Sequence, residues 1–540
     1  MKSRFLMLLT TITVFALLAL PLQFAAQDKP DHRGHYHYQL IDMGTFGGAV
    51  SAINFAGDIG NAAVNAHGVT VGFSETSTPR LPTSNHLICG GDDGFGSFIT
   101  HAFRWQDGTV TDLGALPPAE TDCSNAYRIS ASGEIIGFSE NGRIDPLTGF
   151  NQSRAVRWRD AQIEDLGSFG GNQNEGLAIN NHGQIVGFSL NTVPDPYSLF
   201  DFLLSFPNAT NGTQTRAFLW QQGKMEDLGT LGTGNDAAAF MINEHGQIAG
   251  ASYINSTPNP VTGIPTVNPF FWQHGTMVDI GSFGGAFGQP NFLNNRGQVV
   301  GGSSVPADPG ACFFEDYPNC HPFLWEKGNL LDLATTTIGG VPQTADGIND
   351  DGEIIGSADF FNTGGSPFDA YVWRKGVATD LGTLPGDCYS RAMAINFHGQ
   401  IVGHALSCPN FDFHHAILWE NGAIIDLNAQ IPKNSPLQLA FADDINDRGE
   451  VAGMGVPTGV DPSNVLTQGR AFLLIPCDEN HSGIEGCDYS LVDAAAATRE
   501  SPAPVLHGPT TTTPRSLRSL GRRGVALSLG QTGARNTARW

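Results

Sequence analysis

The chain has 540 residues, a formal net charge of −24 and only 15% charged residues. An acidic surface repels nucleic acid and anionic membranes, so we expect neither as a partner of the folded part. The 67 glycines and the short apolar runs without helical periodicity predict an all-β protein with many turns.

The N-terminus has the pattern of a signal peptide over residues 1–26. Lys2 and Arg4 precede an apolar run from Phe5 to Leu22. This order is typical of a secretory signal, so we expect a secreted protein, extracellular or periplasmic, without a membrane span after cleavage. A membrane anchor is the alternative, because the run is near the shortest length that spans a bilayer.

Residues 27–37 are predicted to form a flexible leader. His32, His35 and His37 lie close enough in sequence to ligate a metal ion. A solvated leader is the interpretation that we favour.

A single strand-like segment, Tyr38 to Gly44 (YQLIDMG), stands before the first complete repeat unit. The last unit ends in Ala471 to Ile475 and lacks a fourth strand. We therefore predict that the N-terminal strand completes the last unit and closes a ring without an open edge.

An Asp-Leu-Gly element recurs along the chain, with Met or Ile allowed for Leu and Ala or Asn for Gly. Each interval has room for four short strands, as between Leu228 and Gly281. A repeat with four short strands in each unit predicts a β-propeller of eight four-stranded blades over residues 38–487. Because the aspartate recurs in every unit, we assign it a structural role. The eight positions are Asp42, Asp112, Asp165, Asp227, Asp279, Asp332, Asp380 and Asp426.

Two tight turns repeat in the units: Asn-x-x-Gly, as in Asn180 to Gly183, and Trp-x-x-Gly, as in Trp220 to Gly223. Asn in the first position and Gly in the last are typical of bulged hairpin turns. In a four-stranded antiparallel blade both turns lie on one face of the disc, the plain face, which we expect to be short and uniform. The longer connections lie on the opposite face, the elaborated face, where we expect binding.

The loops of the elaborated face carry aromatic clusters, which favour recognition of a glycan or a protein surface. The alternative is that these rings pack the loops onto the disc. The predicted binding residues are Phe313, Tyr317, Phe411, Phe413, Asp236 and Asp346.

Six acidic residues fall near the start of the first strand in six units. If these carboxylates converged on a central channel, a cation would be needed to neutralise them, and Ca²⁺ prefers oxygen ligands. A calcium-binding ring is therefore one hypothesis, and acids directed into solvent are the alternative. The six are Asp122, Glu175, Asp236, Asp346, Asp387 and Asp443.

The eight cysteines are even in number and form no Cys-x-x-Cys pair, which favours disulfides in an exported protein. The predicted strand order brings their loops together in four pairs. These pairs are Cys89 with Cys123, Cys312 with Cys320, Cys388 with Cys408, and Cys477 with Cys487. Residues 488–540, rich in Ala, Thr, Pro, Ser and Arg, are predicted to be disordered.

The repeated elements Asp-Leu-Gly, Ile-Asn-x-x-Gly-Gln-Ile-Val-Gly and His-Ala-Phe-x-Trp, the last at His101 to Trp105, resemble the bacterial extracellular HAF repeats. The resemblance covers about residues 38–476. It implies an exported bacterial repeat protein and supplies neither a reaction nor a catalytic residue.

Three functions fit this sequence. The favoured hypothesis is a monomeric binding module for a glycan or a protein surface, because the sequence holds no nucleophile elbow, metalloprotease motif or phosphate loop. A glycosidase or lyase that uses paired carboxylates is the second hypothesis, and a purely structural surface protein is the third. The carboxylates of the second hypothesis are Asp122, Glu175, Asp236 and Asp346.

Overall fold

The structure is a computed structural model that describes residues 38–53, 63–80, 86, 98–117, 122–160, 162–204, 212–307, 312, 320–360, 368–407, 414–478 and 481. All of them belong to the compact unit His35–Trp540. The predicted signal peptide, leader and C-terminal tail lie outside these residues. Within the described part, no helix is both long and apolar enough to cross a membrane.

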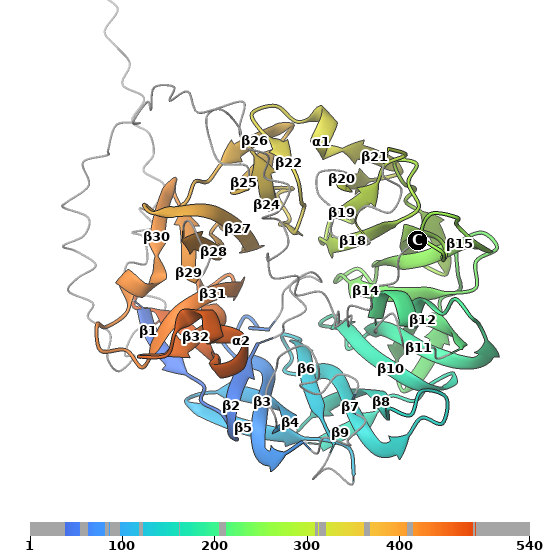
Figure 1. The fold of residues 1–540 in the computed structure, drawn as a ribbon, viewed down its shortest axis with the longest axis horizontal. Helices are drawn as coiled ribbons and strands as arrows, with labels where there is room; N and C mark the ends of the chain where they lie inside the picture. The colour runs from blue at the N-terminus through green and yellow to red at the C-terminus, as the bar shows by residue number, and fades with distance from the viewer. Residues whose placement is uncertain are drawn as a thin grey trace, which may run out of the picture. The chain divides into compact units, whose positions relative to one another are not determined.

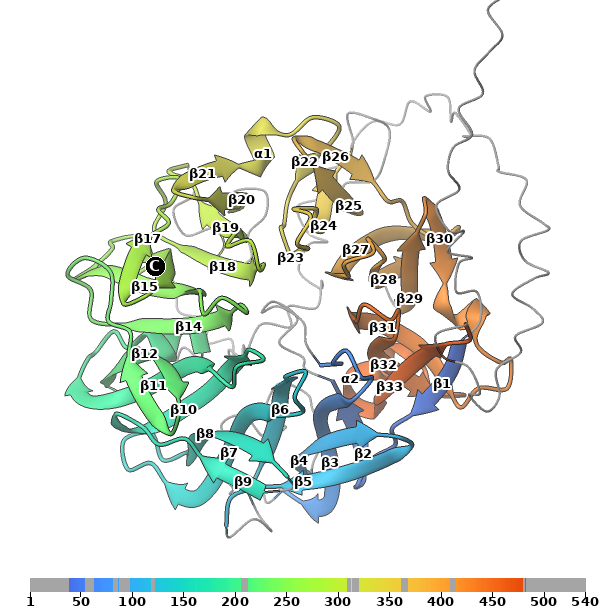
Figure 2. The same ribbon diagram turned by 180° about the vertical axis from the view of Figure 1, so that it is seen from behind.

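The described residues form eight antiparallel sheets arranged as the blades of a ring (Figures 1 and 2). This confirms the predicted all-β propeller of eight blades. Blade 1 consists of β2 (Gly47–Ala52), β3 (Thr70–Pro79), β4 (Phe98–Gln106) and β5 (Thr109–Gly114), and blade 2 of β6 (Ser124–Ile129), β7 (Ile135–Ile144), β8 (Asn151–Arg159) and β9 (Gln162–Asp165). Blade 3 consists of β10 (Gly170–Ile179), β11 (Ile185–Pro194), β12 (Thr213–Gln221) and β13 (Lys224–Asp227), and blade 4 of β14 (Ala237–Ile242), β15 (Ile248–Pro258), β16 (Pro265–Gln273) and β17 (Thr276–Asp279).

The other half of the ring repeats this order. Blade 5 consists of β18 (Gly288–Leu293), β19 (Val299–Ser304), β20 (Cys320–Glu326) and β21 (Asn329–Asp332). In blade 6, β22 (Val341–Pro342) and β23 (Gly347–Ile348) both pair with β24 (Ile354–Asp359), followed by β25 (Asp369–Arg374) and β26 (Val377–Asp380). Blade 7 consists of β27 (Asp387–Ile395), β28 (Ile401–Ser407), β29 (His414–Glu420) and β30 (Ala423–Asp426), and blade 8 of β31 (Leu437–Ile445), β32 (Val451–Pro457), β33 (Arg470–Pro476) and β1 (Tyr38–Asp42).

The N-terminal strand closes the ring, as predicted. β1 pairs antiparallel with β33, from Tyr38 opposite Pro476 to Asp42 opposite Phe472. Beyond the ladder, Arg470 Nη1 donates to Asp42 Oδ2 at 3.0 Å and the Met43 N–H donates to the Ala471 carbonyl. The strand that precedes blade 1 therefore belongs to blade 8.

The asparagine of the Asn-x-x-Gly turn links neighbouring blades. In Asn243, Oδ1 accepts from the backbone N–H groups of His245 and Gln247, and Nδ2 donates to the carbonyl of Asn294 in the next blade at 2.9 Å. Ser130 takes the asparagine position in blade 2. The seven side chains that make this bond to the following blade are Asn65, Asn180, Asn243, Asn294, Asn349, Asn396 and Asn446.

The glycine of the Ile-Val-Gly element faces a β-bulge. The innermost strand of blade 3 shifts register between Gly176 and Ala178, which brings the carbonyl of Glu175 close to β11. A Cβ added at Gly187 would collide with this carbonyl oxygen. Glycine is therefore required opposite the bulge.

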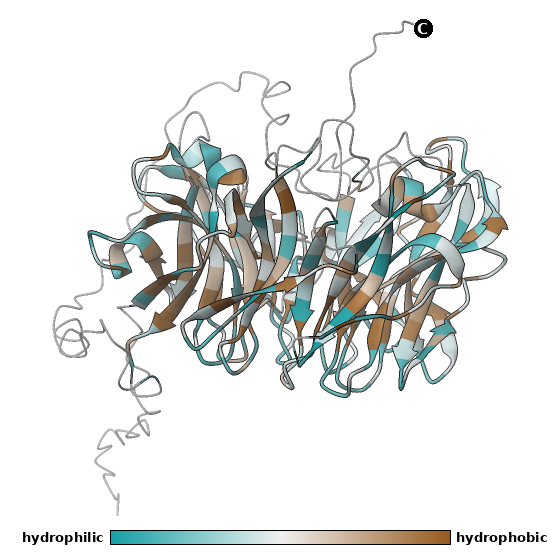
Figure 3. Cartoon of the chain, turned by 90° about the horizontal axis from the view of Figure 1, so that it is seen from below, coloured by the Kyte–Doolittle hydropathy of each residue, from teal (hydrophilic) through white to brown (hydrophobic). Residues whose placement is uncertain are grey.

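Apolar side chains pack between neighbouring blades. The tryptophan of the Trp-x-x-Gly turn is buried in all six blades that have one, and so is Trp158 of blade 2, which has Ala161 at the glycine position and is only 1% exposed. Trp158 packs with Val71, Ala102 and Ala126 between blades 1 and 2. Seen from the side, apolar residues occupy the middle of the sheets (Figure 3). Burial of one such side chain contributes about 2–3 kcal/mol.

The aspartate of Asp-Leu-Gly has the predicted structural role. In all eight copies its Oδ1 accepts the backbone N–H two residues ahead. Asp332 and Asp426 also cap the short helices α1 (Leu333–Thr336) and η3 (Leu427–Gln430). The other short helices in the described part of the chain are η1 (Phe200–Leu204), η4 (Pro462–Asn464) and α2 (Val465–Gln468).

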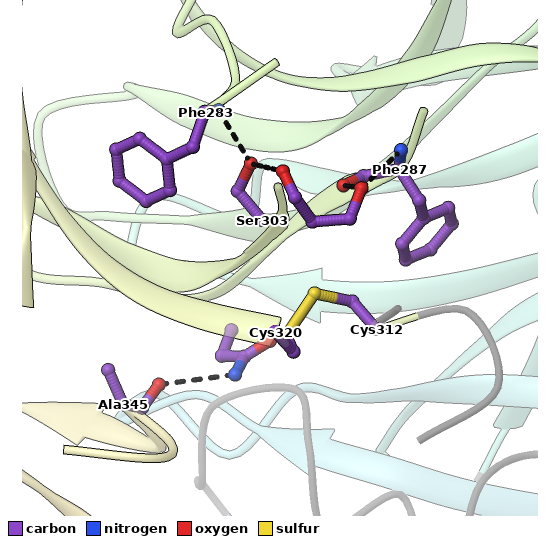
Figure 4. The surroundings of a disulfide bond; sticks show 8 residues. Phe283, Phe287, Ser303, Cys312, Cys320 and Ala345 are labelled. Carbon is purple, nitrogen blue, oxygen red and sulfur yellow. Dashed lines mark hydrogen bonds between the residues drawn. A yellow bond between two sulfur atoms is a disulfide. The ribbon is translucent and has the colours of Figure 1, made fainter. Parts of the chain in front are cut away.

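One predicted disulfide is confirmed directly. Cys312 and Cys320 are bonded, with Cα atoms 4.9 Å apart. Figure 4 shows Ser303, Phe283 and Phe287 of the same blade and Ala345 of the next blade around this bond. Three further cysteines, Cys123, Cys388 and Cys477, are also disulfide-bonded. Their predicted partners, Cys89, Cys408 and Cys487, lie outside the described residues.

Candidate functional site

Four of the six predicted binding residues lie outside the described residues. These are Phe313, Tyr317, Phe411 and Phe413. The remaining two, Asp236 and Asp346, are buried and lie in blades 4 and 6. Their role in binding stays a prediction.

Three acids of the predicted ring, Glu175, Asp236 and Asp443, are held by different neighbours. Glu175 accepts the Tyr127 hydroxyl at 2.9 Å, and Asp236 accepts the backbone N–H of Leu199 at 2.6 Å. Burial raises the pKa of Glu175 to about 7 and also raises the pKa of Asp236. Burial and the neighbouring charge of Asp444 raise the pKa of Asp443 to about 7. No hydrogen bond or ion pair between described residues joins two of the six, and the calcium ring stays a prediction.

Asp346 and Arg391 form an ion pair between blades 6 and 7. Asp346 lies just before β23. Its backbone N–H donates to the carbonyl of Ile355 on β24, and the next residue, Gly347, is also paired with Ile355, so two consecutive residues face one. This extra residue resembles the bulges of the other blades. Arg391 Nε donates to Asp346 Oδ2 at 3.0 Å, and the two side chains are 24% and 4% exposed. A nearly buried carboxylate thus holds a partly exposed guanidinium.

A second ion pair lies on blade 7. His415 Nδ1 is 2.9 Å from Asp387 Oδ2, with 27% and 3% of the side chains exposed. Asp387 at the start of β27 pairs with Ser407 at the end of β28, so both lie at the elaborated end of the blade. Two of the six predicted acids, Asp346 and Asp387, therefore each form one of these two neighbouring ion pairs.

Two buried histidines and an aromatic ring pack together near these ion pairs. The rings of His404 and His414 have centroids 5.8 Å apart, and the Phe441 ring of blade 8 contacts both at 5.0 and 4.4 Å. Burial lowers the pKa of His414 to about 4 and that of His404 well below 6.5, so both are neutral at pH 7. We call Asp346, Asp387, Tyr389, Arg391, His404, His414 and His415 the blade 6/7 cluster.

The blade 6/7 cluster lies where the repeat pattern breaks. Eleven residues before most Asp-Leu-Gly aspartates stands a donor that bonds the aspartate, as Arg154 bonds Asp165 and His321 bonds Asp332. In blade 6 this position is Asp369, and in blade 7 His415 contacts Asp387 instead. Positions that obey the repeat maintain the fold, so departures from it indicate another role.

The sequence reasoning missed Arg391, His404 and His414. A comparison of the repeats contains a signal for His404, because Phe138 and Phe188 occupy the same position after the Ile-Val-Gly or Ile-Ile-Gly element. The ion pair of Arg391 with Asp346 joins two blades and has no counterpart in the periodic pattern.

The plain face is not featureless, contrary to our expectation. A cavity of about 520 Å³ lies there between blades 3 and 4. Its lining includes His182, His245 and His274 together with Glu244 and Trp272. The turns are short as predicted, but their side chains leave a hollow between adjacent blades.

Several solved structures are remotely similar to this chain. The acylaminoacyl peptidase of Pyrococcus horikoshii is 11% identical, with a TM-score of 0.35, over 67% of this chain and 54% of that chain. The β-propeller domain of the Trilobed protease from Pyrococcus furiosus is 10% identical, with a TM-score of 0.35, over 67% and 98%. Trypanosoma rangeli sialidase in complex with sialic acid is 10% identical, with a TM-score of 0.28, over 79% and 61%.

This chain spans about half the length of the Pyrococcus horikoshii peptidase. No family model matches the chain, and no curated protein matches it. At such low identities and TM-scores, these similarities indicate no function for this chain.

Proposed function

We propose that this protein is an exported repeat protein of the HAF type that binds a glycan through the elaborated face of blades 6 and 7. The observation that carries the proposal is an exposed aromatic ring beside the blade 6/7 cluster. Phe368 is 42% exposed, and its ring centroid lies 6.0 Å from that of Tyr389. The Phe368 carbonyl also accepts the backbone N–H of Ser390 on β27, which holds this residue against blade 7.

The chemistry of the cluster matches that of a sugar. A sugar ring offers C–H groups that pack on an aromatic face and hydroxyls that bond charged side chains. Phe368 supplies the ring, while Arg391 and His415 supply partly exposed polar groups. Since Asp346 and Asp387 already hold these two side chains, binding would cost less side-chain entropy.

The predicted aromatic anchors support the same location. Phe411 and Phe413 precede His414 directly in sequence, in the connection from β28 to β29. The signal-like N-terminus and the repeated His-Ala-Phe-x-Trp element support export and the HAF resemblance. Monomeric state and ligand class remain part of the proposal.

A glycan array probed with the full chain tests the proposal, and Phe368→Ala is the decisive variant. Loss of a stacking ring costs about 1 kcal/mol or more, so affinity should fall about fivefold or more. Phe397→Ala is the matched control, because Phe397 is 58% exposed in the β27–β28 turn, at the plain end of blade 7. Equal effects of the two substitutions would contradict the assignment of the site.

A hydrolase and lyase screen on the same glycans tests the enzyme hypothesis. If the protein only binds, bound glycans should be recovered unchanged. Cleavage that is lost in Glu175→Gln or Asp236→Asn would favour the carboxylate mechanism instead.

A further inference from the structure

At two junctions of the ring, the residue before the tryptophan of one blade packs on the tryptophan of the next blade. The guanidinium carbon of Arg157 in blade 2 lies 4.5 Å from the ring centroid of Trp220 in blade 3. Phe271 of blade 4 contacts Trp325 of blade 5, with ring centroids 4.9 Å apart. The tryptophan of a blade can therefore be covered by a cation or by another ring.

Carboxylates hold the cation at the junction between blades 2 and 3. Arg157 Nη1 lies 3.2 Å from Glu134 Oε1, and Nε lies 2.7 Å from Glu164 Oε2. The guanidinium thus has an aromatic ring at its face and carboxylates at its edge, which suits its planar set of donors. The chain itself contains one guanidinium site at a junction.

The next junction, between blades 3 and 4, lacks this internal cation. Leu219 occupies the position of Arg157 in strand register. Leu219 and Trp272 both line the plain-face cavity of about 520 Å³, a size within the range of pockets that hold ligands. The cavity is thus bounded by the two positions that hold Arg157 and Trp220 at the preceding junction.

The lining of this cavity favours a cation. It includes the carboxylate of Glu244, and neither lysine nor arginine is among the described residues that line it. Glu244 Oε2 accepts the backbone N–H of Asn181 at 3.2 Å, which orients the carboxylate and leaves it able to accept further hydrogen bonds. The net charge of −24 also attracts cations to the protein over longer distances.

The junction between blades 5 and 6 differs in this respect. Asp350 takes the turn position of Glu244 and likewise accepts a backbone N–H of the preceding blade. The position of His182 holds Arg296 there, and Arg296 Nη1 donates to the Asp350 carbonyl at 3.0 Å. A cation of the chain thus already lies at that turn.

We propose that the plain-face cavity between blades 3 and 4 binds the guanidinium group of an arginine side chain. Trp272 is the stacking ring, and Glu244 accepts the N–H donors of the guanidinium. The arginine belongs to a peptide segment, either of a partner protein or of residues 488–540 of this chain. The site lies on the opposite face from the proposed glycan site and does not depend on it.

Ligand-observed NMR with the full chain and the peptide acetyl-Gly-Gly-Arg-Gly-Gly-amide tests the proposal, because this method detects weak binding. The same peptide with citrulline in place of arginine is the control, since citrulline has nearly the same shape without the charge. We expect the citrulline peptide to bind at least about tenfold more weakly. Equal binding of the two peptides would overturn the proposal.

Substitutions locate the site on the protein. Glu244→Gln should weaken binding of the arginine peptide about fivefold or more. Asp350→Asn is the matched control, because it removes one negative charge from the same turn position in blade 6 and should leave binding unchanged. Leu219→Arg should abolish binding, since it places a guanidinium of the chain where Arg157 lies in blade 2. Equal effects of Glu244→Gln and Asp350→Asn would overturn the proposal, even if Leu219→Arg fails to fold.

A variant with four C-terminal arginines replaced by alanine separates the two sources of the arginine. If the chain supplies its own arginine, the peptide should bind this variant at least about fivefold more tightly than the wild-type protein; with a partner as the source, the two affinities should be equal. Absence of peptide binding to both proteins would overturn the proposal. The four residues are Arg515, Arg518, Arg522 and Arg523.

Discussion

Asn294 illustrates how a single repeated residue supports two levels of structure. Its Oδ1 accepts the N–H groups of Arg296 and Gln298 within its own turn, and its Nδ2 donates to the carbonyl of Asn349 in blade 6. The side chain is 4% exposed, so water cannot replace these bonds easily. The local turn and the junction between blades thus depend on the same amide.

Asn294→Ala should destabilise the protein by about 2–3 kcal/mol, because it leaves buried backbone groups without partners. Chemical denaturation measures this loss as a change in the free energy of unfolding. The adjacent Asn295→Ala is the control, since Asn295 is exposed and bonds Asp350 at the surface. Its substitution should cost less than about 0.5 kcal/mol. Similar losses in the two variants would contradict the role given to Asn294.

His404 should make the protein less stable in mild acid. Burial, His414 and Arg391 keep its folded-state pKa well below 6.5, so as pH falls below 6.5 only the unfolded chain binds the proton. Stability contributed by the neutral ring is present above pH 6.5 and lost below it. For one such histidine the loss between pH 7 and pH 5 is about 2 kcal/mol.

His404→Phe tests this linkage with a residue that other blades carry at the same position. The wild-type protein should lose about 2 kcal/mol more than the variant when the free energy of unfolding is measured at pH 7 and at pH 5. Buried acids with raised pKa values, such as Glu175 and Asp443, act in the opposite direction but are common to both proteins. Parallel pH profiles would show that His404 is not buried in its neutral form.

At the level of elements, β1 is the strand on which the ring depends. Deletion of Tyr38–Asp42 would leave the backbone groups of β33 unpaired at an open edge. We expect aggregation or a large loss of stability, measured by size-exclusion chromatography with light scattering and by thermal unfolding. Deletion of residues 30–34 is the control and should leave a monomer of normal stability. A monomeric, stable protein without β1 would refute the closure by this strand.

The disulfides give a second prediction at this level. Cys312 and Cys320 close a short loop at the start of β20, and Cys123, Cys388 and Cys477 are bonded as well. Non-reducing peptide mapping should find Cys312 linked to Cys320, and the other three linked to Cys89, Cys408 and Cys487 respectively. Free thiols or another pairing would contradict the predicted arrangement of loops.

At the level of the whole molecule, the sequence predicted what recurs. Asp-Leu-Gly, Asn-x-x-Gly and Trp-x-x-Gly each correspond to a hydrogen bond or a buried ring that recurs in at least six of the eight blades, so periodicity reveals them. The contacts of Arg391 with Asp346 and of His86 with Glu140 occur once and join different blades. Such contacts depend on distances between loops, which no repeat spacing encodes. The candidate sites therefore required the structure.

Pairing of β1 with β33 also has a consequence for the order of folding. Tyr38 and Pro476 are partners although more than 400 residues separate them in sequence. Blades 1 to 7 consist of local hairpins and can form as soon as their own strands are available, whereas blade 8 needs strands from both ends of the repeat region. Because long-range pairing is slow, we expect formation of blade 8 to be the last and rate-limiting step. Until that step β1 stays unpaired. During this interval the chain is most exposed to proteolysis and to pairing with other chains.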